Sequence, residues 1–231
     1  MKRFWKDVTI KEAEGGFRVL LDGRALRTQG GRAQIVPTRA LAESLAEEWR
    51  AQAEEVDSRS FPLRDLADLA IDHVAPARAA AIASVLRYAE TDTLCYRADP
   101  DEPLYRRQLA LWEPVVAAAE ARHGIKLERV SGIVHRPQPA TTLARLRENL
   151  AGRDDFTLAA VFALAPLAAS LTIALEAIEP GADAPALFAA ANCEQDWQAE
   201  LWGWEPEAEA NRASRLAAFE AAARFARLTR D

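Results

Sequence analysis

The spacing of the apolar residues changes once along this chain, near Pro37, and that change restricts the fold more than any other feature. Before it, apolar side chains alternate with polar ones at Phe17, Val19 and Leu21, which is the pattern of a half-buried β-strand. The Asp22-Gly23 pair that follows suits the positive φ angles of a tight hairpin turn. The chain is therefore expected to begin with β-structure.

Two further segments are expected to complete a small antiparallel meander. Residues 24–28 are the predicted return strand, and Gly30-Gly31 predicts a second turn into a strand at residues 33–36. A sheet this small is not stable alone, so its apolar face needs a partner.

The helix predicted next can supply this partner. Thr38 is the expected N-cap, and Leu41, Leu45 and Trp49 then recur at steps of four residues. We expect this apolar stripe to pack on the meander, and Trp49 to be a structural residue.

Helical spacing dominates the rest of the 231 residues. Residues 125–135 are predicted to be extended, and Gly124 suits the left-handed residue that ends the preceding helix. The sequence thus predicts an α+β fold, with a small β-containing domain at residues 1–60 and a larger, mostly helical domain at residues 61–231. Helices are expected near residues 63–74, 77–95, 103–122, 142–151, 185–201 and 207–228.

The twenty residues from Phe156 to Leu175 carry no charge. Their number matches a membrane span, but a helix buried on all sides of a soluble protein has the same pattern. Seven alanines and Pro166 within the run favour the buried core helix. We expect no stable membrane insertion, and a peripheral membrane protein is the less favoured alternative.

Charge and cysteine content restrict the partners and the compartment. The formal net charge of −6 and the pI of about 5.3 argue against binding to nucleic acid or acidic lipid. The two cysteines are too few for a disulfide framework, and no apolar signal stretch follows Lys2 and Arg3. The 25 Arg against four Lys are typical of a GC-rich bacterial genome. From the cysteines and the missing signal stretch we expect a protein of the bacterial cytoplasm, and we expect it to be monomeric when free.

Enzymatic motifs are absent from the sequence. The three histidines, His73, His123 and His135, have no pair at metal-ligand spacing. The sequence also contains no phosphate-binding loop and no nucleophile elbow. We therefore expect no metal, no cofactor and no catalytic residue.

Five residues are candidates for binding a partner. Glu90 and Asp92 lie near the end of a predicted helix, where the helix dipole disfavours negative charge. A solvated or ion-paired helix end is the alternative to a binding role for these two. Glu194 falls on an apolar line of the predicted helix at 185–201, and Asp196 and Trp202 are its neighbours. The residues of this line are Leu187, Ala191, Glu194, Gln198 and Leu201.

Tryptophan is concentrated around Glu194. Trp197, Trp202 and Trp204 are three of the six tryptophans and lie within eight residues. Tryptophan is common in binding hot spots, but these rings could equally fill the core between the last two helices. For Glu194, the alternative to a binding role is an internal ion pair with Arg212 or Arg215.

Short stretches along nearly the whole chain carry a resemblance to a known family. They are Arg3–Lys6, Gly16–Arg24, Glu48–Gln52, Phe61–Leu63, Ala70–Asp72, Tyr88–Arg97, Trp112–Pro114 and Glu194 with Trp202-Gly203. In this order and spacing they are similar to the assembly chaperones of the F-type ATP synthase, the family of ATP synthase mitochondrial F1 complex assembly factor 2.

The resemblance implies a β-containing N-terminal unit, a larger helical bundle and a chaperone that performs no chemistry. Its implied client is the α subunit of the ATP synthase, whose β-facing surface is an aggregation hazard until assembly covers it. The residues alone leave an alternative, a carboxylate-based enzyme that uses Glu90, Asp92 or Glu194 on a small metabolite.

Overall fold

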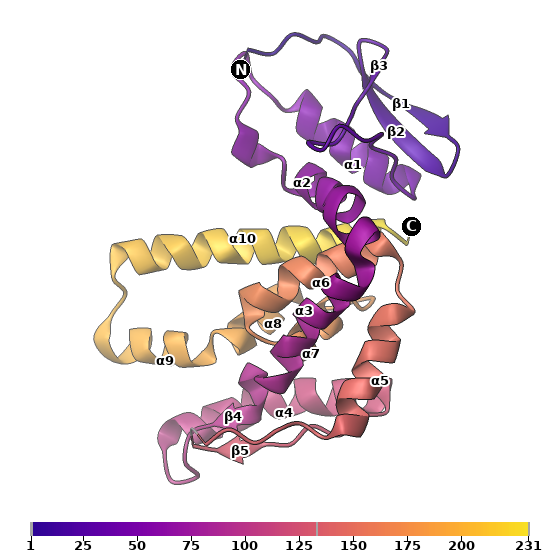
Figure 1. The fold of residues 1–231 in the computed structure, drawn as a ribbon. Coiled ribbons are helices and arrows are strands. Elements are labelled where there is room, and N and C mark those ends of the chain that lie inside the picture. Colours follow the sequence, from indigo (N-terminus) through magenta and orange to yellow (C-terminus); the bar gives the residue numbers. More distant parts are fainter. Residues whose placement is uncertain (1, 133, 231) are drawn as a thin grey trace. The chain divides into compact units, whose positions relative to one another are not determined.

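The computed structural model describes residues 2–132 and 134–230 and confirms the α+β class. It has two compact units (Figure 1). Unit 1 consists of Met1–Arg78, Asp154–Ala160 and Arg224–Asp231, and unit 2 of Ala79–Arg153 and Val161–Ala223. The first unit thus extends past residue 60 and includes two later segments. The domain boundary at residue 60 stays a prediction.

Unit 1 contains the predicted meander. Strands β1 (Val8–Ala13), β2 (Gly16–Leu21) and β3 (Arg24–Ala25) form one antiparallel sheet in that order. Asp22 and Gly23 take the expected positive φ angles of 47° and 78°. The return strand is shorter than predicted, since it ends at Ala25. The predicted strand at 33–36 is reduced to two isolated bridges, Phe17 with Val36 and Arg27 with Ala33.

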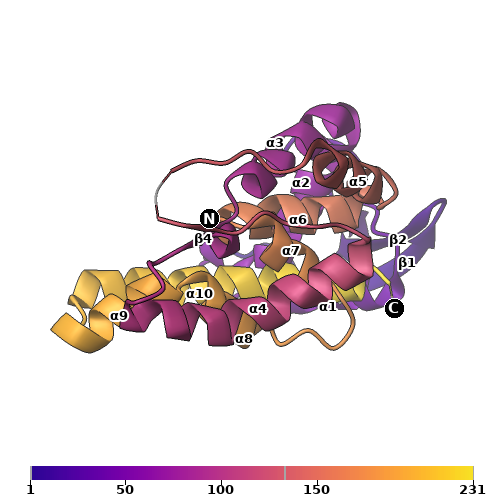
Figure 2. The same ribbon diagram turned by 90° about the horizontal axis from the view of Figure 1, so that it is seen from below.

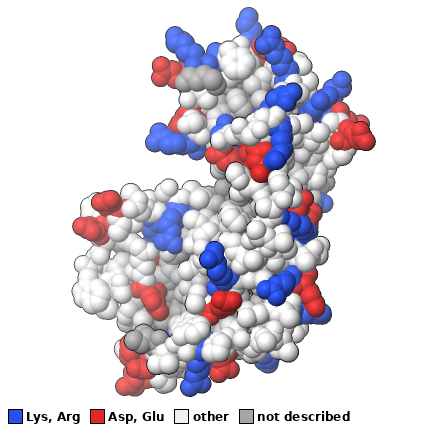
Figure 3. Space-filling model, viewed as in Figure 1, with Lys and Arg blue, Asp and Glu red and all other residues white. Residues whose placement is uncertain are grey.

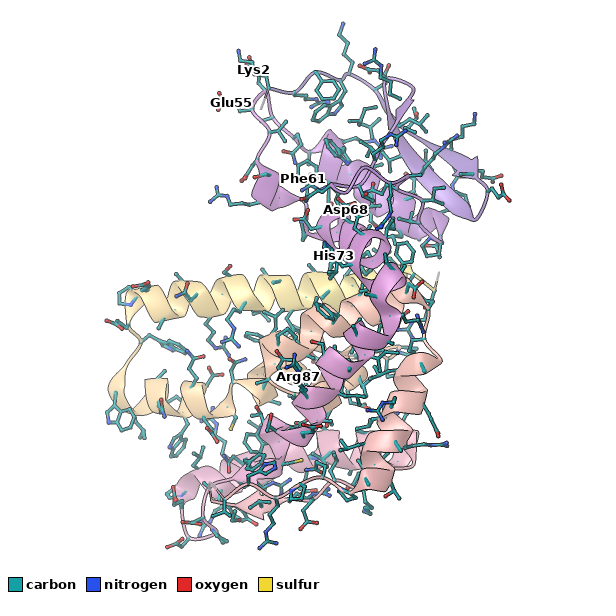
Figure 4. The ribbon with its side chains drawn as sticks, viewed as in Figure 1. Lys2, Glu55, Phe61, Asp68, His73 and Arg87 are labelled. Atoms are coloured by element: carbon teal, nitrogen blue, oxygen red, sulfur yellow. The ribbon has the colours of Figure 1, made fainter. Side chains whose placement is uncertain are left out.

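Two carboxylates explain why this ladder stops early. The backbone N–H of Gln29 donates to Asp68 at 3.0 Å, and that of Gly30 donates to Asp72 at 2.8 Å. Thr28 also donates its hydroxyl to Asp72. The loop after β3 is therefore bonded to the helical segment that carries Asp68, labelled in Figure 4, and not to a neighbouring strand.

Helix α1 (Arg39–Arg50) begins as predicted, with the Thr38 hydroxyl accepting from the N–H of Leu41 at 3.1 Å. Its buried stripe packs against β1 and β2. Trp49 is buried, and its ring lies 5.0 Å from that of Trp5 and 4.6 Å from that of Phe61. These three rings, called the unit 1 aromatic cluster below, join the N-terminal segment to α1 and to the start of α2.

Helix α2 (Pro62–Leu69) has no side-chain cap of its own. Glu48 of α1 supplies one, because its carboxylate accepts from the N–H groups of Leu63 and Arg64 at 2.7 and 3.0 Å. Burial raises the pKa of Glu48, although these two hydrogen bonds act against the shift. A π-helical turn, Ala70–Val74, then extends the helix.

Unit 2 is mainly helical. Gly124 ends α4 with a φ of 63°, as predicted, and the extended segment after it contains β5. Ile133, named in that prediction, lies outside the described residues.

Helices α6 and α10 contribute residues to both units. The elements are α3 (Arg78–Glu90), β4 (Tyr96–Arg97), α4 (Pro103–His123), β5 (Val130–Ser131), α5 (Ala140–Ala151), α6 (Asp155–Ala168), α7 (Leu171–Ala177), α8 (Ala184–Ala191), α9 (Cys193–Trp202) and α10 (Pro206–Leu228).

An ion-pair network holds the segment after α4. Glu120 accepts hydrogen bonds from the N–H of Leu127 at 2.8 Å, from Lys126 at 2.9 Å and from Arg129 at 2.5 Å. Burial by itself raises the pKa of Glu120. The three donors outweigh that effect and lower the pKa to about 2.

The uncharged run at 156–175 forms two helices, so the prediction of one core helix was wrong in part. Helix α6 has 14 residues and α7 has seven, and most of their residues are buried as expected. Ala169 between them takes a φ of 48°, and the Ser170 hydroxyl caps α7 by accepting from Ile173. Neither helix has the roughly 20 residues that a membrane span needs.

Another helical run, Pro62–Cys95, is long and apolar enough to cross a membrane by length and composition alone. Core helices of soluble proteins meet the same test, and the apolar side of α3 is buried here through Ala81, Ile82, Val85, Leu86 and Ala89.

Candidate client-binding site

Helix α9 and the start of α10 form a hairpin, called the α9–α10 turn below (residues 193–211; Figures 1 and 2). A single helix at 185–201 was predicted, but the helix is interrupted at Asn192, so α9 starts anew with Glu194 and Asp196 in its first turn. Acidic residues are favoured there by the helix dipole. The chain reverses at Gly203, whose φ of 87° disfavours any other residue, and α10 starts at Pro206.

Glu194 is exposed and faces α4. Its carboxylate accepts a hydrogen bond of 2.8 Å from the buried amide of Gln108. It also lines a hollow of about 680 Å³, together with Tyr96, Arg97 and Asp99. The predicted apolar line through Glu194 was wrong, because Gln198 and Leu201 on it are exposed once the helix breaks at Asn192.

The ion pair suggested for Glu194 belongs to Asp196. Arg212 of α10 donates two hydrogen bonds of 2.6 Å to the Asp196 carboxylate, and Arg215 donates to the backbone oxygen of Leu167. The guanidinium of Arg212 also lies 5.8 Å from the centre of the Trp204 ring. This ion pair joins α9 to α10. Glu194 has no such ion pair among the described residues.

A second arginine is held in the same way by the next turn of α9. Arg107 of α4 forms a bidentate pair with Glu200, with one bond of 2.7 Å, and lies 5.7 Å from the centre of the Trp197 ring. The hydrogen bonds from Arg107 lower the pKa of Glu200. Each of the two arginines is thus bound by a carboxylate of α9 and lies beside an indole ring of the α9–α10 turn.

Trp202 does not fill the core, contrary to one of the two interpretations of the tryptophan group. Its side chain is 78% exposed, and Leu201 beside it is 56% exposed. Trp204 is 37% exposed and lines a hollow of about 380 Å³ between α9 and α10, together with Glu200, Glu209 and Leu216. At this turn, on the left in Figure 3, the outermost surface is acidic or uncharged.

Glu90 and Asp92 lie in different surroundings. Glu90 is exposed at the end of α3. Asp92 is buried, and its carboxylate accepts from the N–H of Leu94 at 3.1 Å and from that of Thr172 at 2.9 Å. Burial raises the pKa of Asp92. Asp92 therefore ties the turn after α3 to the start of α7, and it presents no surface to a client or a substrate.

Within the described ranges, no three His, Cys, Asp or Glu side chains are arranged to hold a metal ion. Both cysteines are buried, and burial raises the pKa of Cys95 to about 12, which leaves it a poor nucleophile.

Sequence reasoning missed several residues of this surface. Leu201 was not assigned to it, nor were Gln108 and Arg107, which bind Glu194 and Glu200. Arg212 was named, but as a possible partner of Glu194 and not of Asp196. One signal was present in the sequence: residues 193–211 hold six acidic side chains and no Lys or Arg. The partners from α4 could not be found in this way, because they are about 90 residues away in sequence.

Comparison with known proteins gives the family. Residues 2–120 match the family model of the ATP12 chaperone protein. The chain belongs to the ATP12 chaperone family. The mitochondrial protein atp12 of Schizosaccharomyces pombe is 26% identical over 214 residues, which cover 87% of this chain and 74% of that protein.

Solved structures extend the similarity beyond residue 120 to the α9–α10 turn. The crystal structure of Atp12 from Paracoccus denitrificans has 42% sequence identity and a TM-score of 0.94, covering 99% of this chain and 98% of that one. The Atu1473 protein of Agrobacterium tumefaciens has 37% identity and a TM-score of 0.93, covering 98% and 85% of the two chains. The chain is thus an ATP12-type assembly chaperone for ATP synthase, as the resemblance had indicated.

Proposed function

We propose that this chain binds the newly made α subunit of the F-type ATP synthase in the bacterial cytoplasm. It shields the surface of α that later contacts β, and it leaves when β arrives. The proposal needs no catalysis by the chaperone, because covering an apolar surface is enough to prevent aggregation.

The observation that carries this proposal is the exposed α9–α10 turn of an ATP12-type protein. Exposed large apolar side chains are few among the described residues, and Leu201, Trp202 and Trp204 belong to the same turn. The turn also carries Glu194, which is exposed and bonded to a neutral amide, so its charge is not neutralised by a cation. An apolar surface with unneutralised charge suits binding to a client that offers complementary groups.

The direct test follows aggregation of isolated α subunit by light scattering, with and without an equimolar amount of this protein. We expect α to stay soluble when the chaperone is present, and a one-to-one complex to appear in size-exclusion chromatography. Addition of β subunit should then release the chaperone.

Isolated β subunit is the matched control client. The proposal would be refuted if α aggregates equally fast in both samples. Equal protection of α and β would contradict the choice of α as the client while leaving a general holding activity in place.

A further inference from the structure

The α9–α10 turn has an unusual balance of charge. Residues 193–211 carry six acidic side chains and no Lys or Arg, and they hold three of the six tryptophans. Two of the six carboxylates, Asp196 and Glu200, are neutralised by arginines that come from outside this segment. The remaining four carry the net charge of the surface.

Three of these four are Glu205, Glu207 and Glu209. All three are exposed, and none of them forms an ion pair with any residue that the structure describes. Like charges placed this close together repel one another, and a cationic partner removes that repulsion. The turn is therefore a local surface with charge available for a partner.

The two internal arginines show which side chain this surface binds. Each is held by a carboxylate together with the face of an indole, Arg212 by Asp196 and Trp204, and Arg107 by Glu200 and Trp197. Trp202 is the one indole of the group over which no described Arg lies, and it is also the most exposed. It has three unpaired carboxylates within the next seven residues.

We propose that the α9–α10 turn docks an arginine-bearing apolar surface of the client, with Trp202 and Leu201 as the apolar anchor and Glu205, Glu207 and Glu209 as the charge partners. This inference rests on the proposed function for the identity of the client. Charge complementarity selects the occupant, because the acidic turn repels a second copy of itself, a nucleic acid or an anionic membrane. Arginine suits it better than lysine, since the guanidinium stacks on indole and pairs with carboxylate at once.

The test uses the full chain and two probes, isolated α subunit and a capped synthetic peptide in which arginine alternates with leucine. Trp202→Ala should weaken binding of each probe about 30-fold, the usual effect of losing a tryptophan hot spot. The triple variant Glu205→Gln/Glu207→Gln/Glu209→Gln should weaken it about tenfold at about 50 mM salt. That second effect should shrink at about 500 mM salt, where the charges are screened.

Unit 1 offers matched controls. Phe4 is an aromatic residue that is 65% exposed, and Glu12, Glu14 and Glu55 are exposed acids without a described ion pair. Phe4→Ala and the triple Gln variant of these acids should leave binding of both probes unchanged. A peptide alternating glutamate with leucine should not bind any form of the protein.

Binding of α and binding of the peptide together distinguish failure of this inference from failure of the proposed function. The inference is overturned if Trp202→Ala and the acidic-turn variant bind α as tightly as the unchanged chain, or if the controls weaken binding equally. In that case the proposed function stands, because α is still bound. If α does not bind at all, the proposed function fails and the peptide decides the inference: loss of peptide binding in Trp202→Ala supports the docking surface, and equal binding overturns it.

Discussion

The two groups of tryptophans in this protein differ in what surrounds them. In unit 1, Trp5 and Trp49 are buried and pack on each other, and Trp49 also packs on Phe61. In the α9–α10 turn, Trp197, Trp202 and Trp204 stand among carboxylates, and Trp202 is almost fully exposed. The same residue type therefore builds a core in one place and a surface in the other.

The net charge also differs between unit 1 and unit 2. Unit 1 has 16 basic and 16 acidic side chains, so the net charge of −6 lies entirely in unit 2. Within unit 2 the α9–α10 turn contributes six acids without a basic residue. If the turn binds the client as proposed, a tryptophan beside unpaired charges belongs to a binding surface, and a tryptophan packed on apolar rings belongs to the core. Variants can test this contrast, beginning with the largest expected loss.

Trp49→Ala should cost the most stability. The Trp49 indole contacts the rings of Trp5 and Phe61, so its removal leaves a cavity and exposes apolar area. We expect a loss of about 3–5 kcal/mol in the free energy of unfolding, measured by chemical denaturation. Phe4→Ala, at an exposed ring beside the same cluster, should change it by less than about 0.5 kcal/mol. Unchanged stability with lost client binding would instead place Trp49 on a binding surface.

Glu120 is an ion-paired acid, in contrast to the unpaired acids of the α9–α10 turn, and its variant tests what the pairing contributes to stability. Its folded pKa of about 2 lies below the ordinary value of 4.5, so its stabilising effect is complete above about pH 4.5 and disappears as the pH falls towards 2. At 1.36 kcal/mol per pKa unit this amounts to about 3 kcal/mol at most. The stability difference between the unchanged chain and Glu120→Gln should therefore stay constant from pH 7 down to about pH 5 and shrink as the pH falls from there towards 2. A difference that does not depend on pH would contradict the lowered pKa.

Asp92→Asn tests whether Asp92 has a structural role. The carboxylate accepts from two buried N–H groups, and an amide in its place can accept with only one of its two terminal atoms. One buried donor is then left without an acceptor, which should cost about 1–3 kcal/mol of stability. Binding of α by the folded fraction should be unchanged. A variant of normal stability that no longer binds α would return Asp92 to the list of client contacts.

The local features of the fold could be predicted from the sequence because each depends on neighbouring residues. Thr38 caps α1 through the N–H three residues later, and Gly124 ends α4 because its φ is positive. The meander followed from alternation and one Asp-Gly turn. These interactions are complete within a few residues, so no tertiary information is needed to expect them.

The two helix breaks could not be predicted in the same way. Ala169 takes a positive φ although it is not glycine, and its carbonyl is bonded to Thr93, which is far away in sequence. The break at Asn192 changes the direction of every later side chain on α9. For this reason the alternative expected from the sequence, an ion pair of Glu194 with Arg212 or Arg215, is not formed, and the structure pairs Arg212 with Asp196. The family resemblance drew attention to this segment, but the pairing within it depends on tertiary contacts with α4 and α10.

Glu194→Gln should have the smallest effect on stability and is compared best with Asp196→Asn. Glu194 is exposed and accepts one hydrogen bond from a neutral amide, so a glutamine of the same shape should change the free energy of unfolding by less than about 0.5 kcal/mol. Asp196→Asn leaves Arg212 without its bidentate partner and should cost about 1 kcal/mol. If Glu194 contacts the client, its variant should lose affinity for α while keeping its stability, whereas the Asp196 variant should lose stability first. A Glu194→Gln protein that binds α normally would remove Glu194 from the binding surface and leave the apolar anchor around Trp202 as its centre.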